Sequence, residues 1–272
     1  MNPLQKYFRQ PKLYMALPSH GNYYEPGALD GDPSKVPVFA MTGMDEIIMK
    51  TPDALFNGEA TIKLIESCCP YIKNAKSIPG IDVDTILASI RIATFGGSLP
   101  ITTTCTACGT ENEYDVDLHS VVEYYSKQKY DNKLSLSDTL IVYFKPLSYH
   151  ESSVFNIEHF SLQQLLGQLA NITDLEERQR KLDTIYSKIA DIEVKNFLNS
   201  IESVKSEDTS VTDREHIREW LANCDLVYYE MVKNHLKNIK KTWTMPKYDV
   251  VCEHCGAKDS TDIILDQSHF FG

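Results

Sequence analysis

Hydrophobic positions along the chain follow two different spacings. Short stretches in which apolar residues alternate predict strands at 36–41 and at 138–147. Apolar positions three and four residues apart predict amphipathic helices elsewhere, because that spacing places them on one face of a helix. In the first half we expect helix starts at Thr42 with Asp45, at Thr51-Pro52 and at Asp84, a helical stripe of Ile62, Ile65 and Cys69, and a helix end at Gly96-Gly97.

The second half of the chain is predicted to be mostly helical. A Ser or Thr followed three residues later by Glu or Gln is a capping-box pattern, and it precedes three amphipathic stripes. These starts are Ser161 with Gln164, Thr173 with Glu176, and Thr212 with Glu215. We expect a helical lobe over 150–241 with Trp220 and Tyr228 in its core, and a polar linker at 203–210 between its last two helices.

An internal repeat is the most informative feature of the sequence. Residues 105–118 read CTACGTENEYDVDL, and residues 252–267 read CEHCGAKDSTDIILDQ. Upstream, Met41-Thr42 with Asp45 is similar to Leu147-Ser148 with Glu151. The chain is therefore predicted to hold two copies of a strand, helices, a CxxCG turn and a further strand. Aligned without gaps, Cys105, Cys108, Gly109, Asp115, Val116 and Leu118 match Cys252, Cys255, Gly256, Asp262, Ile263 and Leu265.

The two CxxC pairs are candidate metal ligands, namely Cys105, Cys108, Cys252 and Cys255. A CxxC turn directs two sulfurs at one tetrahedral ion, with a zinc–sulfur distance of about 2.3 Å. The glycine after each pair permits the positive φ that closes such a turn. The pattern predicts one structural zinc per chain in a split zinc ribbon. Strand-like segments flank the turns at 99–104, 114–118, 248–251 and 262–265.

Three other uses of the CxxC pairs compete with this interpretation. A redox pair is typically followed by a helix, whereas strands are expected here. Two disulfides need an oxidising compartment. A catalytic zinc keeps an open fourth position, whereas four thiolates close its coordination shell. The remaining cysteines, Cys68, Cys69 and Cys224, lie on predicted helices and are expected to be buried apolar residues.

Composition and charge disfavour several classes of function. The 272 residues include 27 Lys and Arg against 38 Asp and Glu, a net charge of −11, which disfavours a nucleic-acid-coating protein.

No apolar run is long enough to cross a membrane, and the N-terminus lacks the apolar segment of a secretion signal, so we expect cytosolic folding without disulfides. No phosphate loop, dinucleotide fingerprint or HExxH motif occurs. The acid pairs Asp82–Asp84 and Glu176–Glu177 have no catalytic neighbours, so we assign no catalytic residue and expect no enzyme.

These patterns predict an α+β fold, mostly helical, with short strands and a split four-cysteine zinc ribbon formed by two pseudo-repeats. The expected segments are an extended N-terminal arm (1–34), a first repeat with the first knuckle (35–118), a strand with an inserted helical lobe (119–246), and the second knuckle with an aromatic tail (247–272).

The order of several short motifs resembles the baseplate-hub family of T-even-type contractile-tailed phages. The resemblance covers most of 14–118 and 248–272 and is less specific over 150–245. Its motifs are Leu17-Pro18-Ser19-His20-Gly21-Asn22-Tyr23-Tyr24, Met41-Thr42-Gly43-Met44-Asp45-Glu46, Gly58-Glu59-Ala60 to Cys68, Leu87-Ala88-Ser89-Ile90-Arg91-Ile92-Ala93-Thr94-Phe95-Gly96, the two CxxCG knuckles, and Phe270-Phe271-Gly272.

The resemblance implies a structural or tail-assembly protein of a phage baseplate that acts by protein–protein binding. It implies assembly in the host cytoplasm, a place in the virion tail baseplate or in its assembly, and partners among hub, wedge and tape-measure proteins. A zinc-ribbon nucleic-acid accessory protein is the chief alternative, and a hydrolase with an unrecognised site is a second. The charge of −11 and the acids beside the first knuckle argue against nucleic acid.

Both ends of the chain carry aromatic residues without a helical or strand period. Phe270 and Phe271 end the tail, and the arm holds a larger group. Apolar termini are poorly ordered unless something holds them. Two interpretations stay open: the ends pack on the chain's own surface, or one or both dock on a neighbouring baseplate subunit. The aromatic residues of the arm are Tyr7, Phe8, Tyr14, Tyr23 and Tyr24.

Overall fold

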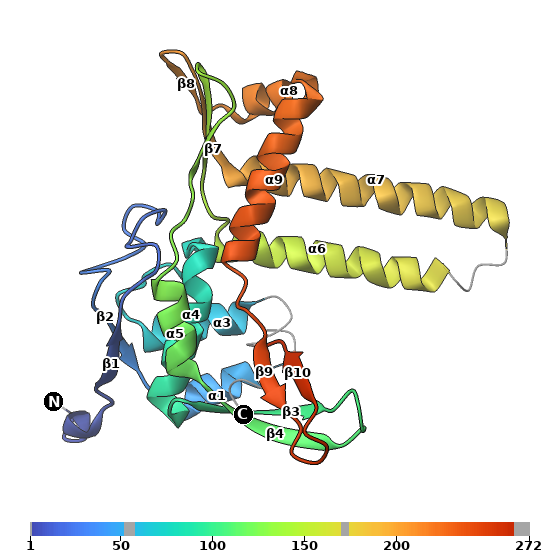
Figure 1. Cartoon of the computed structure of the whole chain (residues 1–272). Coiled ribbons are helices and arrows are strands. Elements are labelled where there is room, and N and C mark those ends of the chain that lie inside the picture. The colour runs from blue at the N-terminus through green and yellow to red at the C-terminus, as the bar shows by residue number, and fades with distance from the viewer. Residues whose placement is uncertain (1, 52–57, 170–173, 264–272) are drawn as a thin grey trace. The chain divides into compact units, whose positions relative to one another are not determined.

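The computed structural model describes residues 2–51, 58–169 and 174–263 and divides the chain into two compact units (Figure 1). The first unit combines the chain up to Lys129 with the segment from Lys240 onward, and the second spans Tyr130–Ile239. Helices are mixed with short antiparallel strands in both, which confirms the predicted α+β class. None of the described helices is both long and apolar enough to cross a membrane.

Helix α4 (Gly80–Phe95) forms the centre of the first unit. Its Ile86 and Ile90 side chains are fully buried, and it packs against helices α3 and α5 and strands β1 and β2. The predicted start at Asp84 is wrong, because Pro79 occupies the N-cap and Asp84 lies in the second turn. The other elements of this unit are η1 (Gln5–Tyr7), β1 (Pro11–Met15), β2 (Val36–Phe39), α1 (Gly43–Met49), α3 (Glu59–Cys68), η2 (Ala75–Ser77), β3 (Ser98–Thr104), β4 (Glu111–Asp117), α5 (Leu118–Ser126), β9 (Tyr248–Val251) and β10 (Lys258–Thr261).

The predicted strand at 36–41 and the predicted helices at Thr42 and at Ile62 are confirmed by β2, α1 and α3. The helix end at Gly96 is also confirmed, and Gly96 has a φ of +94°. The predicted start at Thr51-Pro52 reaches into 52–57, which lie outside the described residues.

Strand β1 is an element of the N-terminal arm that the sequence did not predict. It pairs antiparallel with β2, with Met15 opposite Val36 and Tyr14 opposite Pro37. Met15 is buried, whereas Tyr14 on the other side of the strand is exposed. Five residues are too few to distinguish such a strand from a loop by alternation alone.

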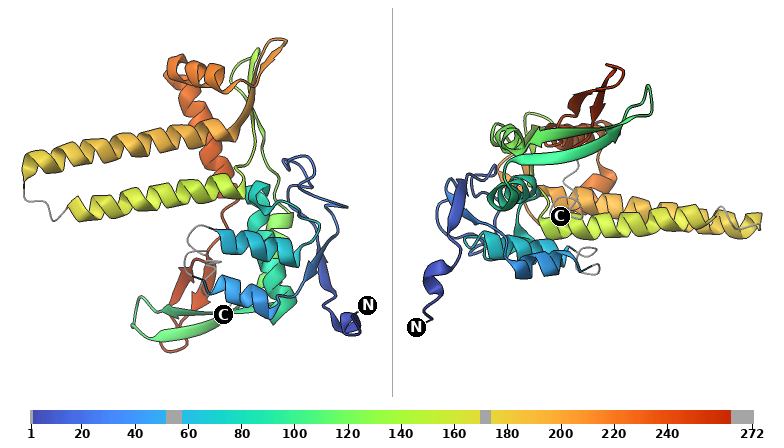
Figure 2. Two further views of the ribbon diagram at one scale, coloured as in Figure 1. Left: turned by 180° about the vertical axis from the view of Figure 1, so that it is seen from behind. Right: turned by 90° about the horizontal axis from the view of Figure 1, so that it is seen from below.

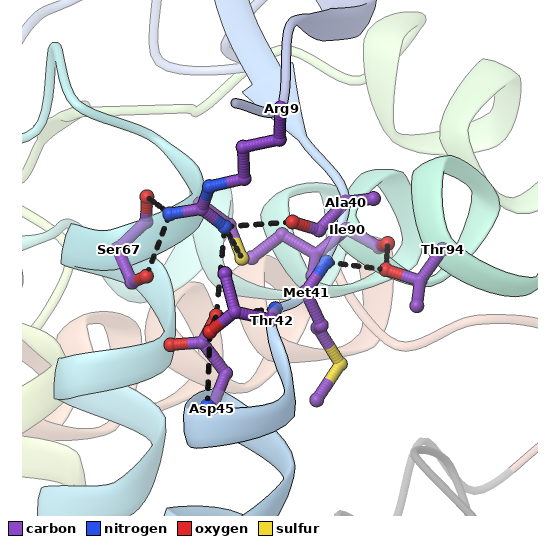
Figure 3. Close-up of polar contacts among 9 residues, drawn as sticks. Arg9, Ala40, Met41, Thr42, Asp45, Ser67, Ile90 and Thr94 are labelled. Carbon is purple, nitrogen blue, oxygen red and sulfur yellow. Dashed lines mark hydrogen bonds and ion pairs between the residues drawn. The ribbon is translucent and has the colours of Figure 1, made fainter. Parts of the chain in front are cut away.

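Arg9 fixes the arm to the first unit (Figure 3). Its guanidinium donates hydrogen bonds to Ala40 O at 2.6 Å and to Ser67 O and Oγ at 2.7 and 2.8 Å. It also forms an ion pair with Asp45 at 3.5 Å. The Asp45 carboxylate closes the capping box of α1 by accepting from Thr42 N at 2.7 Å. One arginine therefore joins the arm to the start of α1 and the end of α3.

A second polar contact holds the loop 19–24 against α4. Ser19 donates to the Asp82 carboxylate through N and Oγ at 2.7 and 2.6 Å, and the Tyr24 hydroxyl donates to it at 3.0 Å. Asp82 is fully buried, and burial raises the pKa of its carboxyl to about 6 despite these hydrogen bonds. Gly21 has a φ of +78°, which allows the tight bend of the loop. The motif Leu17 to Tyr24 therefore folds the arm back on α4 through these contacts.

The second unit contains a four-stranded antiparallel sheet in the order β5-β6-β7-β8. Val142 and Phe144 of β6 and Ile201 of β7 form its core together with Ile217 of α8 and Val232 of α9. The alternation predicted at 138–147 is confirmed by β6. The elements are β5 (Lys133–Ser135), β6 (Leu140–Phe144), α6 (Tyr149–Gln168), α7 (Leu175–Ser200), β7 (Ile201–Ser206), β8 (Thr209–Val211), α8 (Arg214–Asn223) and α9 (Leu226–Thr242), of which α9 runs into the first unit at its last residues.

Helices α6 and α7 run side by side as a long antiparallel hairpin (Figures 1 and 2). The predicted start at Ser161 is wrong, because Ser148 and Glu151 form the capping box that begins α6. Ser161 lies in mid-helix and donates to Ile157 O instead. The predicted cap Thr173 lies outside the described residues, and Asp174 caps α7. A small cluster of Leu162, Leu169 and Ile185 joins the two helices.

The predicted linker at 203–210 is wrong, since these residues belong to the β7–β8 hairpin. Val204 packs into the core because alternate residues of a strand reach one face. The stripe predicted from Thr212 is capped by Asp213 and is interrupted at Cys224, so it forms two helices rather than one. Trp220 and Tyr228 pack against this core but are only partly buried.

Candidate metal centre

Two β-hairpins carry the CxxC pairs, and they share one backbone register. Thr104 faces Glu111 across the β3–β4 hairpin, and Val251 faces Lys258 across β9–β10. The same shift that takes Cys105 to Cys252 relates these two pairs. The second strand of the C-terminal hairpin, β10, occupies Lys258–Thr261, ahead of the strand predicted at 262–265, of which 262 and 263 lie in no strand and 264 and 265 lie outside the described residues.

The two CxxC turns repeat the same backbone hydrogen bonds. Cys105 N donates to Thr110 O, and Gly109 N donates back to Cys105 O, both at 2.9 Å. In the second turn Cys252 N donates to Ala257 O at 2.9 Å and Gly256 N donates to Cys252 O at 2.8 Å. Gly109 and Gly256 have φ values of +72° and +71°. Each turn therefore has the positive-φ glycine expected from the CxxCG pattern.

The hairpins bring all four sulfurs of the CxxC pairs to one point. The Sγ atoms of Cys105 and Cys255 are 3.7 Å apart, as are those of Cys108 and Cys252. All four lie within 4.8 Å of one another, so they could hold a metal ion. Tetrahedral zinc with sulfur ligands at about 2.3 Å needs sulfurs separated by about 3.8 Å. The four sulfurs fit that geometry.

Local hydrogen bonds favour ionisation of two of these cysteines. The backbone N–H groups of Cys255 and His254 lower the pKa of Cys252 to about 6. Hydrogen bonds from Thr110 lower the pKa of Cys108. For Cys255, the Ala257 N–H lowers the pKa, but the neighbouring sulfurs outweigh it and raise the pKa to about 12. Four thiolates this close repel one another, and a divalent cation among them would remove that repulsion.

The sequence did not reveal the side chains that join the two hairpins. Asn112 of β4 accepts a hydrogen bond from Glu253 N at 3.0 Å, and its amide nitrogen donates to Thr110 O at 2.9 Å. Thr106 donates to the Asp259 carboxylate at 2.8 Å. No local pattern marks these residues, because their partners lie more than 130 positions away along the chain.

The remaining cysteines lie apart from this cluster. Cys68 and Cys69 are buried, as predicted, whereas Cys224 is only partly buried and differs from the expectation. Among the described residues, the group that could hold a metal contains Cys105, Cys108, Cys252 and Cys255, with the first of each pair buried and the second exposed.

A family model described as T4 bacteriophage base plate protein matches residues 36–272. The chain belongs to this family. This match confirms the resemblance to T4-type baseplate proteins. The protein is accordingly a structural protein of the phage baseplate. Membership implies contacts with other tail or baseplate proteins and a structural rather than an enzymatic role. No curated protein and no solved structure matched the chain.

Proposed function

We propose that this protein is a hub or tail-assembly component of a contractile-tail baseplate and acts by binding other baseplate proteins. In this proposal one zinc ion, held by Cys105, Cys108, Cys252 and Cys255, stabilises the fold without taking part in chemistry. We also propose that the chain is organised into four segments: the arm (1–34), the first repeat (35–118), the strand with the inserted lobe (119–246), and the second knuckle with its tail (247–272).

The convergence of the four sulfurs carries the proposal of a structural zinc. The two CxxC pairs are far apart along the chain, yet their sulfurs approach to 3.7 Å. Four thiolate ligands leave no open position for substrate or water, which favours a structural ion. Zinc in such a site would tie the C-terminal hairpin to the first repeat, and structural zinc provides on the order of 10–16 kcal/mol of apparent binding free energy in small peptides.

Metal analysis of the full-length protein tests the site. We expect about one zinc per chain in the purified protein. Cys108→Ser and Cys252→Ser should each lose most of the metal, whereas Cys224→Ser, at a cysteine outside the cluster, should keep it. Hydrogen exchange of the metal-free protein should show lost protection over 98–117 and 248–261, with protection over 201–242 retained. Wild-type protein without metal, or unchanged binding in both variants, contradicts the proposal.

The proposed partners are hub, wedge and tape-measure proteins, met first in the host cytoplasm and then in the virion tail. Family membership over 36–272 supports this placement. A tagged copy purified from infected cells should bring baseplate or tail proteins with it, and mature particles should be tested for the chain by mass spectrometry. Co-purification of replication or transcription proteins instead would contradict the assignment.

A zinc-ribbon nucleic-acid accessory protein is the alternative, and the charges on the first hairpin argue against it. Glu111, Glu113 and Asp115 alternate along the exposed face of β4. Their partners across the hairpin are Thr104, Thr102 and Pro100, so no basic side chain lies opposite them. A carboxylate row repels phosphates. Tight, salt-dependent DNA binding by the full-length protein would favour the alternative.

A further inference from the structure

The N-terminal arm exposes a basic and aromatic surface on an acidic protein. Lys6, Arg9 and Lys12 are the only charged side chains before Glu25, in a chain with a net charge of −11. Tyr7 and Tyr14 are 73% and 57% exposed. We call Lys6, Tyr7, Lys12, Tyr14 and Lys35 the basic arm face.

The members of the basic arm face are all exposed and belong to η1, to β1 and to the residue before β2, Lys35. Lys12 and Tyr14 are both exposed on β1, whose register against β2 shifts between Pro11 and Leu13. Lys35 lies over the Tyr14 ring at 5.5 Å, and Lys6 lies over the Tyr7 ring at 4.9 Å. Among the described residues, no carboxylate lies within 4.0 Å of these three lysines, and Asp32 interacts electrostatically with Lys35 from a greater distance.

A surface of opposite charge lies on the hairpin of the first knuckle. Glu111, Glu113, Asp115 and Glu253 line a groove of about 640 Å³, and we call these four residues the acidic ribbon face. The other lining residues, Pro100, Thr102, Asn112 and Tyr114, carry no positive charge. Two exposed surfaces of the same chain are thus complementary in charge.

The two surfaces face away from each other within the first unit. β1 and the tip of the β3–β4 hairpin lie on opposite sides of it, with α4 and α5 between them (Figures 1 and 2). The basic arm face of one molecule therefore lies away from its own acidic ribbon face. A contact between different faces of two copies is heterologous and produces a ring or an open chain of subunits.

We propose that this protein associates head to tail with itself, the basic arm face of one copy docking on the acidic ribbon face of the next. Charge complementarity selects the second copy as the occupant, and the exposed rings add apolar area, since aromatic side chains bury about 150–250 Å² each when covered. Lys6, Tyr7, Lys12, Tyr14 and Lys35 precede residues 36–272, which the family model matches, so this contact goes beyond that match and beyond the proposed function.

Sedimentation velocity of the full-length protein over a concentration series tests the contact. We expect association at about 50 mM salt that weakens at least about 10-fold in affinity at about 500 mM salt, because exposed charges are screened. The double variant Lys6→Glu with Lys12→Glu, and separately Glu111→Lys with Glu113→Lys, should each lose association by about 10-fold or more. Lys188→Glu with Lys237→Glu, which lowers the net charge as much as the arm variant does but on exposed residues of the second unit, should associate as wild type does.

Mixing the two charge-reversed variants is the decisive measurement. The arm variant keeps the wild-type acidic ribbon face, and the ribbon variant keeps the wild-type basic arm face. These two unchanged faces are complementary, so the two variants should associate in pairs on mixing although neither associates alone. Circular dichroism and the metal-to-chain ratio check folding, and Glu111→Gln with Glu113→Gln replaces the ribbon variant if its metal content falls.

Three results would overturn the proposal. The first is a wild-type protein that stays monomeric at low salt, and the second is a mixture of charge-reversed variants that stays monomeric. The third is a monomeric wild type that binds DNA through Lys6 and Lys12, which would make the arm a nucleic-acid contact. Zinc content and co-purified baseplate proteins are measured independently, so failure here leaves the proposed function unaffected.

Discussion

Asn112 and Glu253 join the two CxxC hairpins through one hydrogen bond, from the Glu253 backbone N–H to the Asn112 side-chain oxygen at 3.0 Å. Asn112 is 6% exposed, and its amide nitrogen is also used, since it donates to Thr110 O. One side chain of the first hairpin therefore orients the backbone of the second turn directly beside Cys252.

Removing this side chain should weaken metal binding. Asn112→Ala leaves the Glu253 N–H without its partner, at a cost of about 1–3 kcal/mol for a buried group, and leaves the Thr110 carbonyl with the hydrogen bond from Cys105 N alone. We expect zinc affinity to fall by about 10–100-fold, as is usual when a group that orients metal ligands is lost. Competition with a chelator measures this, with Thr104→Ala on the same hairpin as the control. Equal affinities in the two variants would show that the hairpins are oriented by other contacts.

The positive φ of the two turn glycines leads to a second prediction. A Cβ at Gly109 or Gly256 meets nothing within 4 Å, so the cost of alanine there comes from the backbone conformation alone. We expect each substitution to lower the free energy of unfolding of the hairpins by about 1–2 kcal/mol. Gly43→Ala is the matched control, because Gly43 also has open space but lies at the start of α1 without a positive φ. A destabilised control with stable turn variants would refute the argument.

Asp82 should make the stability of the first unit depend on pH. Its pKa is raised to about 6 from 3.8, so the folded state favours the protonated form. The stabilisation from the bound proton is present below the unfolded pKa and is lost as pH rises through about 6, about 3 kcal/mol in total. Relative to Asp82→Asn, the wild-type free energy of unfolding should therefore fall between about pH 4 and about pH 7. Parallel pH profiles for the two proteins would reject this assignment, and Asp138→Asn, at an exposed residue, is the control.

Trp220 tests the core of the second unit. Its ring packs against the cluster that contains Phe144 and Val232 but stays partly exposed. Trp220→Ala should cost about 2 kcal/mol, less than the 3–5 kcal/mol typical of a fully buried ring. Tyr186→Ala, at a residue 59% exposed on α7, should cost less than about 0.5 kcal/mol. Denaturant unfolding compares the two, and a loss below about 1 kcal/mol for Trp220→Ala would remove it from the core.

Local chemistry made several elements predictable. The helix start at Thr42 and Asp45 and the strand with Val142 and Phe144 depend on neighbours a few residues away, which a sequence displays directly. The capping pattern gave a wrong helix start where two Ser residues had the same spacing to a Glu or Gln. Ser148 with Glu151 begins α6, while Ser161 has an equally suitable spacing but lies within a continuous helix.

The sequence alone determined which four cysteines belong together, because the CxxCG repeat and its spacing are local features of the chain. Only the tertiary structure decided that their sulfurs meet, that Asn112 and Thr106 join the hairpins, and that Arg9 and Asp82 hold the arm. These contacts connect residues 31 to 153 positions apart along the chain. Such pairs form only when the helices and hairpins pack together. Packing depends on contacts among many residues, so no single segment of the sequence predicts these pairs.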